Sequence, residues 1–313
     1  MTPTQLRAFA AVVRLGSVKA AASELDVTES AVSMHIKTLR DELDDRLFVR
    51  TGGRIAFTPG GLRLASRANE LLGLQDQTRR EVRQAAGGKR LLRLAGSALF
   101  NEYAAPGLIE LFSSKADDLE VELSVIPTSQ VAAAVTSRQV DLAVGPELSI
   151  VDLDIERRPF LRYDLIVVAS RKVADRHEDL GASEWSLGPA AAESAGATPA
   201  MLAALGVPES KQRIFQSNAA ALERVRAGEG VGLALGFRVA QEIDEGRLVR
   251  IDTPGVGANG TWNLYSLKGP QLPPAARELT RFITRPRATQ AMLTGTGAGI
   301  ARFKPRVHVT LWS

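Results

Sequence analysis

The segment that most constrains the fold of this chain is residues 17–37, with the sequence SVKAAASELDVTESAVSMHIK. Its pattern predicts two short helices joined by a tight turn. Ser17 can cap the first helix because its hydroxyl can accept a hydrogen bond from a first-turn amide. The alanines at 20–22 keep that helix thin, which allows a partner helix to come close. Asp26 lies at the turn, and aspartate tolerates the left-handed conformation that such a bend requires.

The second helix of this pair has one apolar side, and its remaining faces are mostly polar. Thr28 is placed to cap it, and apolar residues at spacings of three and four predict its buried side. Short polar side chains on the other faces can hydrogen-bond to the base edges in a DNA major groove. We therefore expect DNA contacts from Thr28, Glu29, Ser30, Ser33, Met34, His35 and Lys37. Taken alone, the segment also fits a helical hairpin with a solvated polar face.

The helices before and after this pair complete a compact unit. Thr2, Pro3 and Gln5 have the spacing of a capping box and begin a first helix. Residues 49–57, VRTGGRIAF, predict a β-hairpin around a Gly-Gly turn at 52–53. Arg50 and Arg54 bracket the tip, so the hairpin is expected to act as a wing that contacts DNA phosphates or the minor groove. A solvated turn is the alternative interpretation.

A long helix is expected from Thr58-Pro59 to about residue 86, because no further proline interrupts this stretch. At about 1.5 Å per residue, such a helix is roughly 40 Å long. Its narrow apolar stripe cannot be buried by the helix itself, so we expect it to pair with a second copy of the chain. Gly87-Gly88 ends the helix and forms a hinge.

Composition excludes several classes of protein. The chain has 313 residues, of which 45% are hydrophobic, so it is long enough for two or three domains with real cores. It contains no cysteine, which rules out disulfides and thiolate metal sites, and its three histidines lie far apart. We therefore expect no metal and no cofactor. No basic, apolar leader and no run of about 18 apolar residues occurs, so we expect a soluble cytoplasmic protein without membrane contact.

Charge is distributed unevenly along the chain. Residues 1–90 contain 15 Lys and Arg against 10 Asp and Glu, residues 91–280 contain 18 against 25, and residues 281–313 contain 6 against none. The net charge of the first segment is thus +5, although that of the whole chain is only +4. Local positive charge is what binding to a polyanion requires, so the first segment is expected to bind nucleic acid.

From residue 91 onward, short apolar strands alternate with helices, which predicts an open α/β sheet. We expect strands at 91–95, 121–126 and 141–144, with helices at 97–112 and 129–138 between them. Ligands bind such sheets at the carboxyl ends of strands. The residues at three such ends are Ser97, Thr128, Ser129 and Gly145. They favour a small polar or anionic ligand, and ordinary helix capping is the alternative.

A second α/β unit is expected from residue 165, after a strand through 155 and 157. The chain is predicted to cross between two lobes near 159–163 and again near 262–268, which makes these linkers candidate hinges. Helix starts are expected at Thr198-Pro199 and Ser217-Asn218. The glycines at 228, 230 and 232 follow a helix rather than a strand, so they are not a dinucleotide fingerprint. A closing helix is expected at 273–284, a loose stretch from 286, and one more strand near 307–311.

Residues 6–61, LRAFAAVVRLGSVKAAASELDVTESAVSMHIKTLRDELDDRLFVRTGGRIAFTPGG, resemble the N-terminal part of the LysR-type transcriptional regulators almost position for position. The rest of the chain to about residue 285 is similar to their two-lobed, periplasmic-binding-protein-like effector domain. Glu29 replaces a common glutamine and could accept a hydrogen bond from a cytosine amine. Asp44 replaces a common glycine but still tolerates a left-handed turn.

The resemblance implies an α/β protein with four segments: a winged helix-turn-helix at 1–58, a linker and dimerisation helix at 59–88, an effector-binding domain at 89–285, and a basic tail at 286–313. Lobe I is assigned to about 90–160 with 268–285, and lobe II to about 161–267. The resemblance also extends the effector-binding set to Ser97, Thr128, Ser129, Gly145, Ser217 and Asn218.

The implied function is sequence-specific DNA binding controlled by a small-molecule effector bound between the lobes, without enzymatic activity. The expected partners are double-stranded DNA, the effector, further copies of the chain in a homodimer or homotetramer, and RNA polymerase. Two alternatives remain. One is a LysR-like DNA-binding protein whose effector domain serves assembly only, and the other is a solute-binding α/β protein.

Overall fold

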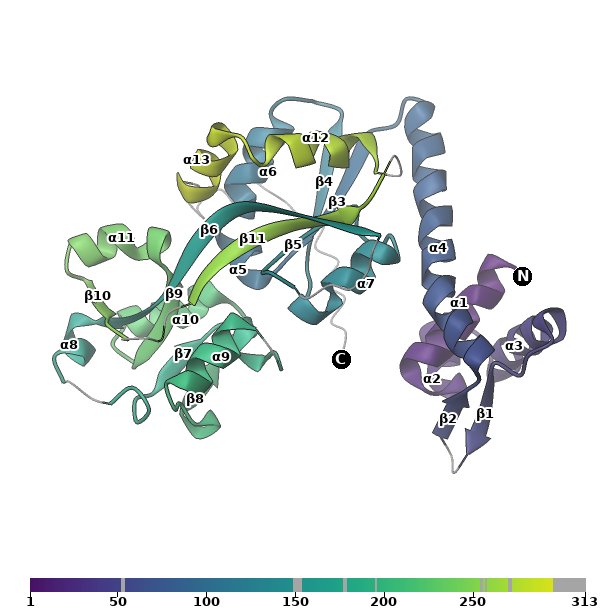
Figure 1. The fold of residues 1–313 in the computed structure, drawn as a ribbon, viewed down its shortest axis with the longest axis horizontal. Helices are drawn as coiled ribbons and strands as arrows, with labels where there is room; N and C mark the ends of the chain where they lie inside the picture. The colour runs from purple at the N-terminus through teal and green to yellow at the C-terminus, as the bar shows by residue number, and fades with distance from the viewer. Residues whose placement is uncertain are drawn as a thin grey trace. The chain divides into compact units, whose positions relative to one another are not determined.

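The computed structural model describes residues 1–51, 54–148, 154–176, 179–194, 196–253, 256, 258–269 and 272–294 (Figure 1). The chain forms two compact units, which divide between Gly88 and Lys89; the short segment Thr136–Gln139 groups with the first unit. The expected turn at 52–53 and the expected strand at 307–311 lie outside the described residues.

The first unit is a winged helix-turn-helix followed by a long helix (Figure 1). Its elements are α1 (Pro3–Leu15), α2 (Val18–Glu24), α3 (Glu29–Leu43), β1 (Phe48–Thr51), β2 (Arg54–Phe57) and α4 (Pro59–Ala85). The core contains the fully buried side chains of Phe9 and Val12 from α1, Val32 and Leu39 from α3, and Leu47. Burying a side chain of this size stabilises a fold by about 1.5–3 kcal/mol.

The caps and turns of this unit follow from local side chains. The capping box of Thr2 and Gln5 is present, and the hydroxyls of Ser17 and Thr28 accept hydrogen bonds from first-turn amides of α2 and α3. Asp26 and Asp44 have φ angles of 53° and 50°, so both predicted left-handed turns are confirmed. The α3 helix continues to Leu43, where Asp44 provides the left-handed C-cap.

The wing is the predicted hairpin. Strands β1 and β2 pair antiparallel, with Phe48 opposite Phe57 and Thr51 opposite Arg54. The rings of the two phenylalanines contact edge to face at a centroid distance of 6.0 Å. This contact ties the base of the wing to the core.

The junction between the wing and α4 is held by Asp45. Its Oδ1 accepts hydrogen bonds from the Leu47 amide at 2.5 Å and from the Thr58 hydroxyl at 2.6 Å. The Thr58 hydroxyl in turn accepts a hydrogen bond from the Gly61 amide at 2.9 Å, which caps α4. A Cβ on Gly61 would lie 1.8 Å from the Leu47 carbonyl oxygen, so only glycine allows this approach.

These hydrogen bonds predict a pH-dependent stability. The bonds from Thr58 and Leu47 lower the pKa of Asp45 below its ordinary value of 3.8. The stabilisation is therefore fully present above pH 3.8 and is lost as the pH falls through the lowered pKa. We expect Asp45→Asn to lower the denaturant concentration at which half of the protein is unfolded, measured at neutral pH. The difference in this midpoint between variant and wild type should shrink in acid. Asp41→Asn, on an exposed position of α3, is the control; an equal effect of both variants would contradict the assigned role.

The second unit is built on one nine-stranded sheet of described residues, in the order β4-β3-β5-β11-β6-β9-β7-β8, with β10 also paired to β6. The strands are β3 (Arg90–Gly96), β4 (Leu119–Val125), β5 (Leu142–Gly145), β6 (Ile155–Ser170), β7 (Trp185–Leu187), β8 (Gln212–Ile214), β9 (Val231–Leu235), β10 (Leu248–Ile251) and β11 (Ala258–Leu267). The helices are α5 (Ala98–Tyr103), α6 (Ala105–Ser113), α7 (Val131–Thr136), α8 (Arg171–Ala174), α9 (Ala197–Ala204), α10 (Asn218–Arg226), α11 (Gly236–Asp244), α12 (Pro274–Phe282) and α13 (Pro286–Thr294). Single 3-10 turns lie at η1 (Thr128–Gln130), η2 (Pro189–Ala192) and η3 (Glu209–Lys211).

Two lobes share this sheet. The first lobe contains β3, β4 and β5 with α5, α6, α7, α12 and α13, and the second contains β7 to β10 with α8 to α11. Strands β6 and β11 run side by side through both lobes (Figure 1). The predicted crossings near 159–163 and 262–268 fall on these two strands, so paired strands rather than irregular linkers join the lobes.

The pairing of β6 with β11 is irregular at one point. Trp262 lies opposite Leu161, but the next residue, Asn263, lies opposite Pro159, so the register shifts by one residue on β6. Proline has no amide hydrogen and therefore cannot donate to a neighbouring strand. The resulting bulge lies between the lobes and bends the strands there.

Three expectations need correction. The single helix expected at 97–112 is two helices, α5 and α6, which break at Ala104 before Pro106. The α9 helix begins at Ala197 after Gly196, so Thr198 is not its cap. The stretch from 286, expected to be loose, forms α13, whose Ala288 and Met292 are buried in the core of the first lobe.

Candidate DNA-binding face and effector cavity

The outer face of α3 carries most of the residues expected to contact DNA. Thr28, Glu29, Ser30, Ser33, Met34 and Lys37 are exposed, and His35 is half-buried. Met34 is the most exposed large apolar side chain on the helix, at 63%. The Thr28 hydroxyl accepts from the Ala31 amide at 3.2 Å and lies 2.9 Å from the Ser30 hydroxyl, so the N-terminal turn is ordered. The helix thus presents hydroxyl, carboxylate and ammonium groups on one accessible side.

A cavity of about 560 Å³ lies beside this face, between α3 and the wing. Its lining includes Val18, Ser33, Ile36, Arg40, Arg46, Phe48 and Val49. The Arg40 guanidinium donates to the Phe48 carbonyl at 2.8 Å and lies 4.6 Å from the centre of the Phe48 ring. Sequence reasoning missed this role of Arg40, which fixes the wing against α3, and missed Arg46, which lines the same cavity as Ser33.

The wing places Arg50 on β1 and Arg54 on β2, where Arg50 pairs with Ile55 and Arg54 with Thr51. Both positions are therefore near the hairpin tip, as the sequence predicted. Their side chains are outside the part of the chain that the structure describes.

The α4 helix has an apolar side that the first unit does not cover. Leu71, Leu74 and Val82 share one side of the helix and are between 42% and 65% exposed, and Leu62 on another side is 59% exposed, whereas Ala68 is buried. Solvent exposure of this many leucine and valine side chains along one helix indicates a surface that another chain covers.

The residues expected to bind an effector lie at four places in the second unit. Ser97 caps α5 through the Phe100 amide, Thr128 and Ser129 form η1, and Gly145 ends β5. Ser217 caps α10 by accepting from the Ala220 amide at 3.1 Å, and Asn218 is the first residue of α10. Ser217 lines a cavity between the lobes, and Asn218 donates a hydrogen bond to Glu102, which lines the same cavity.

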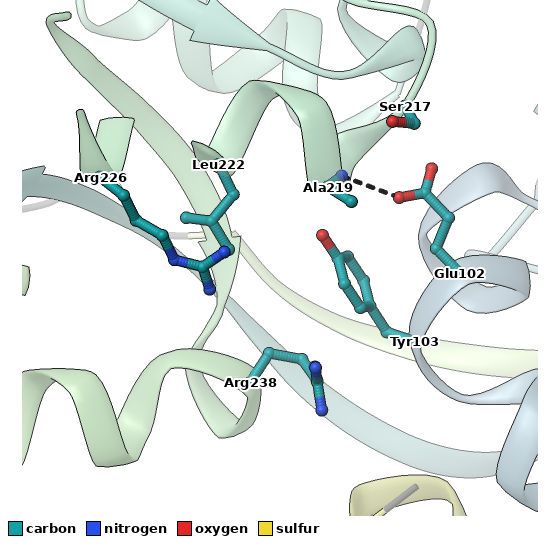
Figure 2. A pocket seen from close by; sticks show the side chains of 7 residues that line it. All are labelled: Glu102, Tyr103, Ser217, Ala219, Leu222, Arg226 and Arg238. Carbon is teal, nitrogen blue, oxygen red and sulfur yellow. Dashed lines mark hydrogen bonds between the residues drawn. The ribbon is translucent and has the colours of Figure 1, made fainter. Parts of the chain in front are cut away.

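This cavity, of about 360 Å³, lies between α5 of the first lobe and α10 and α11 of the second (Figure 2). It is lined by Glu102, Tyr103, Ser217, Ala219, Leu222, Arg226 and Arg238. All but Ser217 were missed from the sequence. Arg226 is the last residue of α10 and Arg238 lies in the first turn of α11, whereas the sequence prediction concentrated on helix caps and on other strand ends.

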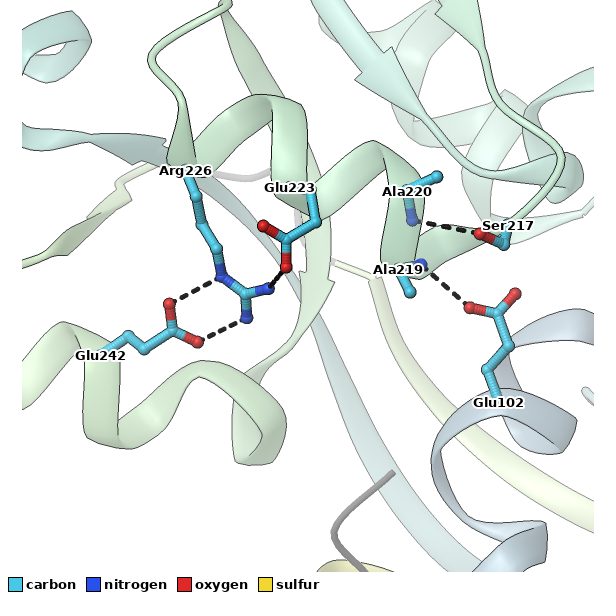
Figure 3. Close-up of polar contacts among 7 residues, drawn as sticks. All are labelled: Glu102, Ser217, Ala219, Ala220, Glu223, Arg226 and Glu242. Atoms are coloured by element: carbon cyan, nitrogen blue, oxygen red, sulfur yellow. Dashed lines mark hydrogen bonds and ion pairs between the residues drawn. The ribbon is translucent and has the colours of Figure 1, made fainter. Parts of the chain in front are cut away.

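The electrostatics of the cavity are mixed. Burial, followed by the charge of Glu102, raises the pKa of Tyr103 to about 12, so its hydroxyl keeps its proton at neutral pH. The Arg226 guanidinium makes two hydrogen bonds with Glu242, at 2.8 and 2.6 Å, and one with Glu223 at 2.5 Å (Figure 3). The pairing with Glu242 raises the pKa of Arg226. The Arg238 guanidinium lies 5.4 Å from the centre of the Tyr103 ring. The cavity thus combines the Tyr103 hydroxyl and the Arg238 guanidinium with the Glu102 carboxylate, whereas the charge of Arg226 is balanced by Glu242 and Glu223.

Within the described ranges, no group of three or more His, Asp or Glu side chains is arranged to hold a metal ion. None of the helices in the described part of the chain is both long and apolar enough to span a membrane.

The fold defines a class: a winged helix-turn-helix and a long helix, followed by a two-lobed α/β domain. Residues 3–62 match the family described as "Bacterial regulatory helix-turn-helix protein, lysR family", and residues 85–286 match the "LysR substrate binding domain". The chain therefore belongs to the LysR-type transcriptional regulators, with a DNA-binding helix-turn-helix and an effector-binding domain. It is a regulator rather than an enzyme.

Individual proteins agree with this assignment. An uncharacterized HTH-type transcriptional regulator of Mycobacterium tuberculosis strain H37Rv is 54% identical over 326 residues, covering 100% of both chains. The RuBisCO operon transcriptional regulator of Allochromatium vinosum is 27% identical, covering 89% of this chain and 94% of its own. Among solved structures, ArgP from Mycobacterium tuberculosis has a TM-score of 0.60 at 22% identity, covering 93% of this chain and 97% of its own. At this identity the structural likeness establishes the fold alone.

Proposed function

We propose that this regulator binds a pseudo-palindromic promoter site as a homodimer or homotetramer, with α3 in the major groove. The observation that carries this proposal is the outer face of α3, where the polar residues predicted to contact bases are exposed together. The wing follows α3 directly and supplies Arg50 and Arg54. The uncovered apolar side of α4 supports pairing of two chains, which would present two copies of α3. A solved neighbour of similar fold, CbnR, is complexed with its target DNA (TM-score 0.57, 18% identity, covering 93% of this chain and 100% of that one).

The cavity between α5, α10 and α11 is the proposed effector site, and the proposed ligand is a small polar or anionic molecule. Arg238 and the protonated Tyr103 hydroxyl support this class, because a guanidinium and a phenol can donate to an anion or to a carbonyl. Ser97, Thr128, Ser129, Gly145 and Asn218 remain the proposed further contacts. The protein LysG of Corynebacterium glutamicum, a neighbour in fold, carries a bound effector Arg in its structure.

The proposed setting is the cytoplasm, where the protein would meet both DNA and RNA polymerase. An effector domain that serves assembly only is the alternative. A thermal-shift screen of small carboxylates and aromatic compounds separates the two, because a ligand that binds the folded state raises the melting temperature.

A mobility shift with the DNA upstream of the protein's own gene tests the DNA-binding proposal. We expect Ser33→Ala combined with Arg54→Ala to weaken binding about tenfold or more, since a base contact and a backbone contact are lost together. Arg213→Ala is the matched control, because it removes the same charge from an exposed side chain of the effector domain. Unchanged binding by the double variant would show that α3 and the wing do not contact the DNA.

A further inference from the structure

The two lobes of the effector domain are joined by a carboxylate that crosses between them. Glu102 lies on α5 in the first lobe, and its side chain reaches the start of α10 in the second (Figure 3). Oε1 accepts from the Asn218 amide and from Asn218 Nδ2, and Oε2 accepts from the Ala219 amide, each at 3.0 Å. The partners are 116 and 117 residues apart in the sequence.

These bonds complete the cap of α10. The first amides of a helix have no partner inside the helix. Ser217 accepts from the third of them, that of Ala220, so Glu102 takes the first two. A carboxylate at a helix N-terminus also interacts favourably with the helix dipole, and hydrogen bonds to an ionised acceptor are the stronger kind.

The base of Glu102 is rigid. Phe100 on the same helix is fully buried, and the Asn101 side chain donates to the Ser124 carbonyl of β4 at 2.7 Å. Glu102 is therefore held by the first lobe while its carboxylate is bound by the second.

Further contacts also cross between the lobes. The Thr128 amide of the first lobe donates to Glu193 Oε2 of the second lobe at 3.4 Å, a longer and weaker bond. The Arg238 guanidinium of α11 lies over the Tyr103 ring of α5. Strands β6 and β11 also link the lobes, and their pairing is interrupted at Trp262 and Asn263. This bulge is a point at which the two strands can bend. Among the described strands, they are the pair that runs through both lobes. Leu235 of β9 belongs to the same core cluster as Leu92 and Phe100 of the first lobe, so apolar packing crosses between the lobes as well.

We propose that Glu102 is an intramolecular latch that holds the two lobes together without a ligand, so that the effector acts by releasing the latch rather than by closing an open cleft. This rests on the proposed function, because it assigns the regulation of the same effector domain. In this arrangement the ligand does not bring the lobes together, because the chain itself already makes the contact between them.

Hydrogen exchange of the full-length protein tests the contact. In wild type, the Asn218 and Ala219 amides should be protected, although first-turn amides usually exchange freely. In Glu102→Ala, we expect both to exchange about tenfold faster or more, whereas the Ala220 amide, capped by Ser217, stays unchanged. Sodium acetate should restore protection in Glu102→Ala, and sodium chloride at the same ionic strength should not. Equal exchange of Asn218 and Ala219 in wild type and variant would overturn the latch.

Spin-label distances test the movement of the lobes. Because the chain has no cysteine, Asp117→Cys in the first lobe and Arg176→Cys in the second would be the only labelled positions. Glu102→Ala and Glu102→Gln are expected to shift the distribution to longer distances, whereas Glu110→Gln, an exposed glutamate of α6, is expected to leave it unchanged. An unchanged distribution in both Glu102 variants would also overturn the latch.

A footprint on the protein's own upstream DNA tests the regulatory part. If release of the latch regulates DNA binding, Glu102→Ala should protect a different stretch of DNA from wild type even without a ligand. An unchanged footprint in a variant whose spin-label distances are longer would contradict regulation by release. Failure of the wild-type protein to bind this DNA would instead contradict the proposed function. Failure of the latch proposal and failure of the proposed function therefore give different results.

Discussion

Replacing Trp262 by alanine should lower the free energy of unfolding of the second unit by about 3–5 kcal/mol, the cost of deleting a large buried aromatic side chain. Trp262 is 1% exposed, its ring centroid is 4.6 Å from that of Tyr163, and it contacts Phe100 edge to face at 5.4 Å. The variant would leave a cavity at the bulge where β6 and β11 pass between the lobes. Chemical denaturation followed by far-UV circular dichroism measures the loss.

Val125→Ala is the control for this experiment. Val125 lies on β4 and is 63% exposed, so its truncation should change the unfolding free energy by no more than about 0.5 kcal/mol. Similar values for the two variants would mean that Trp262 is not part of a tightly packed core.

Asp141→Leu should cost a similar amount, about 3–5 kcal/mol, for an electrostatic reason. Asp141 Oδ1 accepts from Arg93 Nη2 at 2.6 Å, and the two side chains are only 4% and 12% exposed. Asp141 Oδ2 also accepts from the Arg93 amide at 2.8 Å, which fixes the start of β5 beside β3. The variant would leave the guanidinium in the interior without this carboxylate.

The double variant Arg93→Met with Asp141→Leu separates charge from packing. Replacing both partners of a buried ion pair by apolar side chains is often close to neutral. We therefore expect the double variant to be more stable than Asp141→Leu alone in the same denaturation experiment. A double variant that is less stable than the single one would show that the pair acts through shape rather than charge.

The first unit was predictable from the sequence because its signals are local. Thr2, Ser17, Thr28 and Thr58 each cap the helix that follows within a few residues, and Asp44 provides its own left-handed turn. Such signals need no knowledge of distant residues. What the sequence could not supply was the approach of Gly61 to the Leu47 carbonyl, which depends on how α4 packs against the wing.

The second unit was predicted less completely. Its fold class was correct because strand and helix patterns alternate regularly. The proline at 106 was not recognised as the start of a new helix, and β6 was divided in two because Pro159 interrupts its apolar pattern. A proline is tolerated there because its position coincides with the bulge opposite Trp262 and Asn263.

Local sequence patterns were enough to predict the helix-turn-helix, the wing, the long helix, the α/β class of the second domain and the resemblance to a family of regulators. These follow from capping residues, hydrophobic periodicity and turn chemistry, all of which act over a few residues. Long-range packing, which no local pattern encodes, brings Glu102 to the cap of α10, pairs Asp141 with Arg93, and places Tyr103, Arg226 and Arg238 around one cavity. The partners from the two lobes, and the pair of Asp141 with Arg93, are between 48 and 135 positions apart, and no local pattern specifies which distant partners folding will bring together.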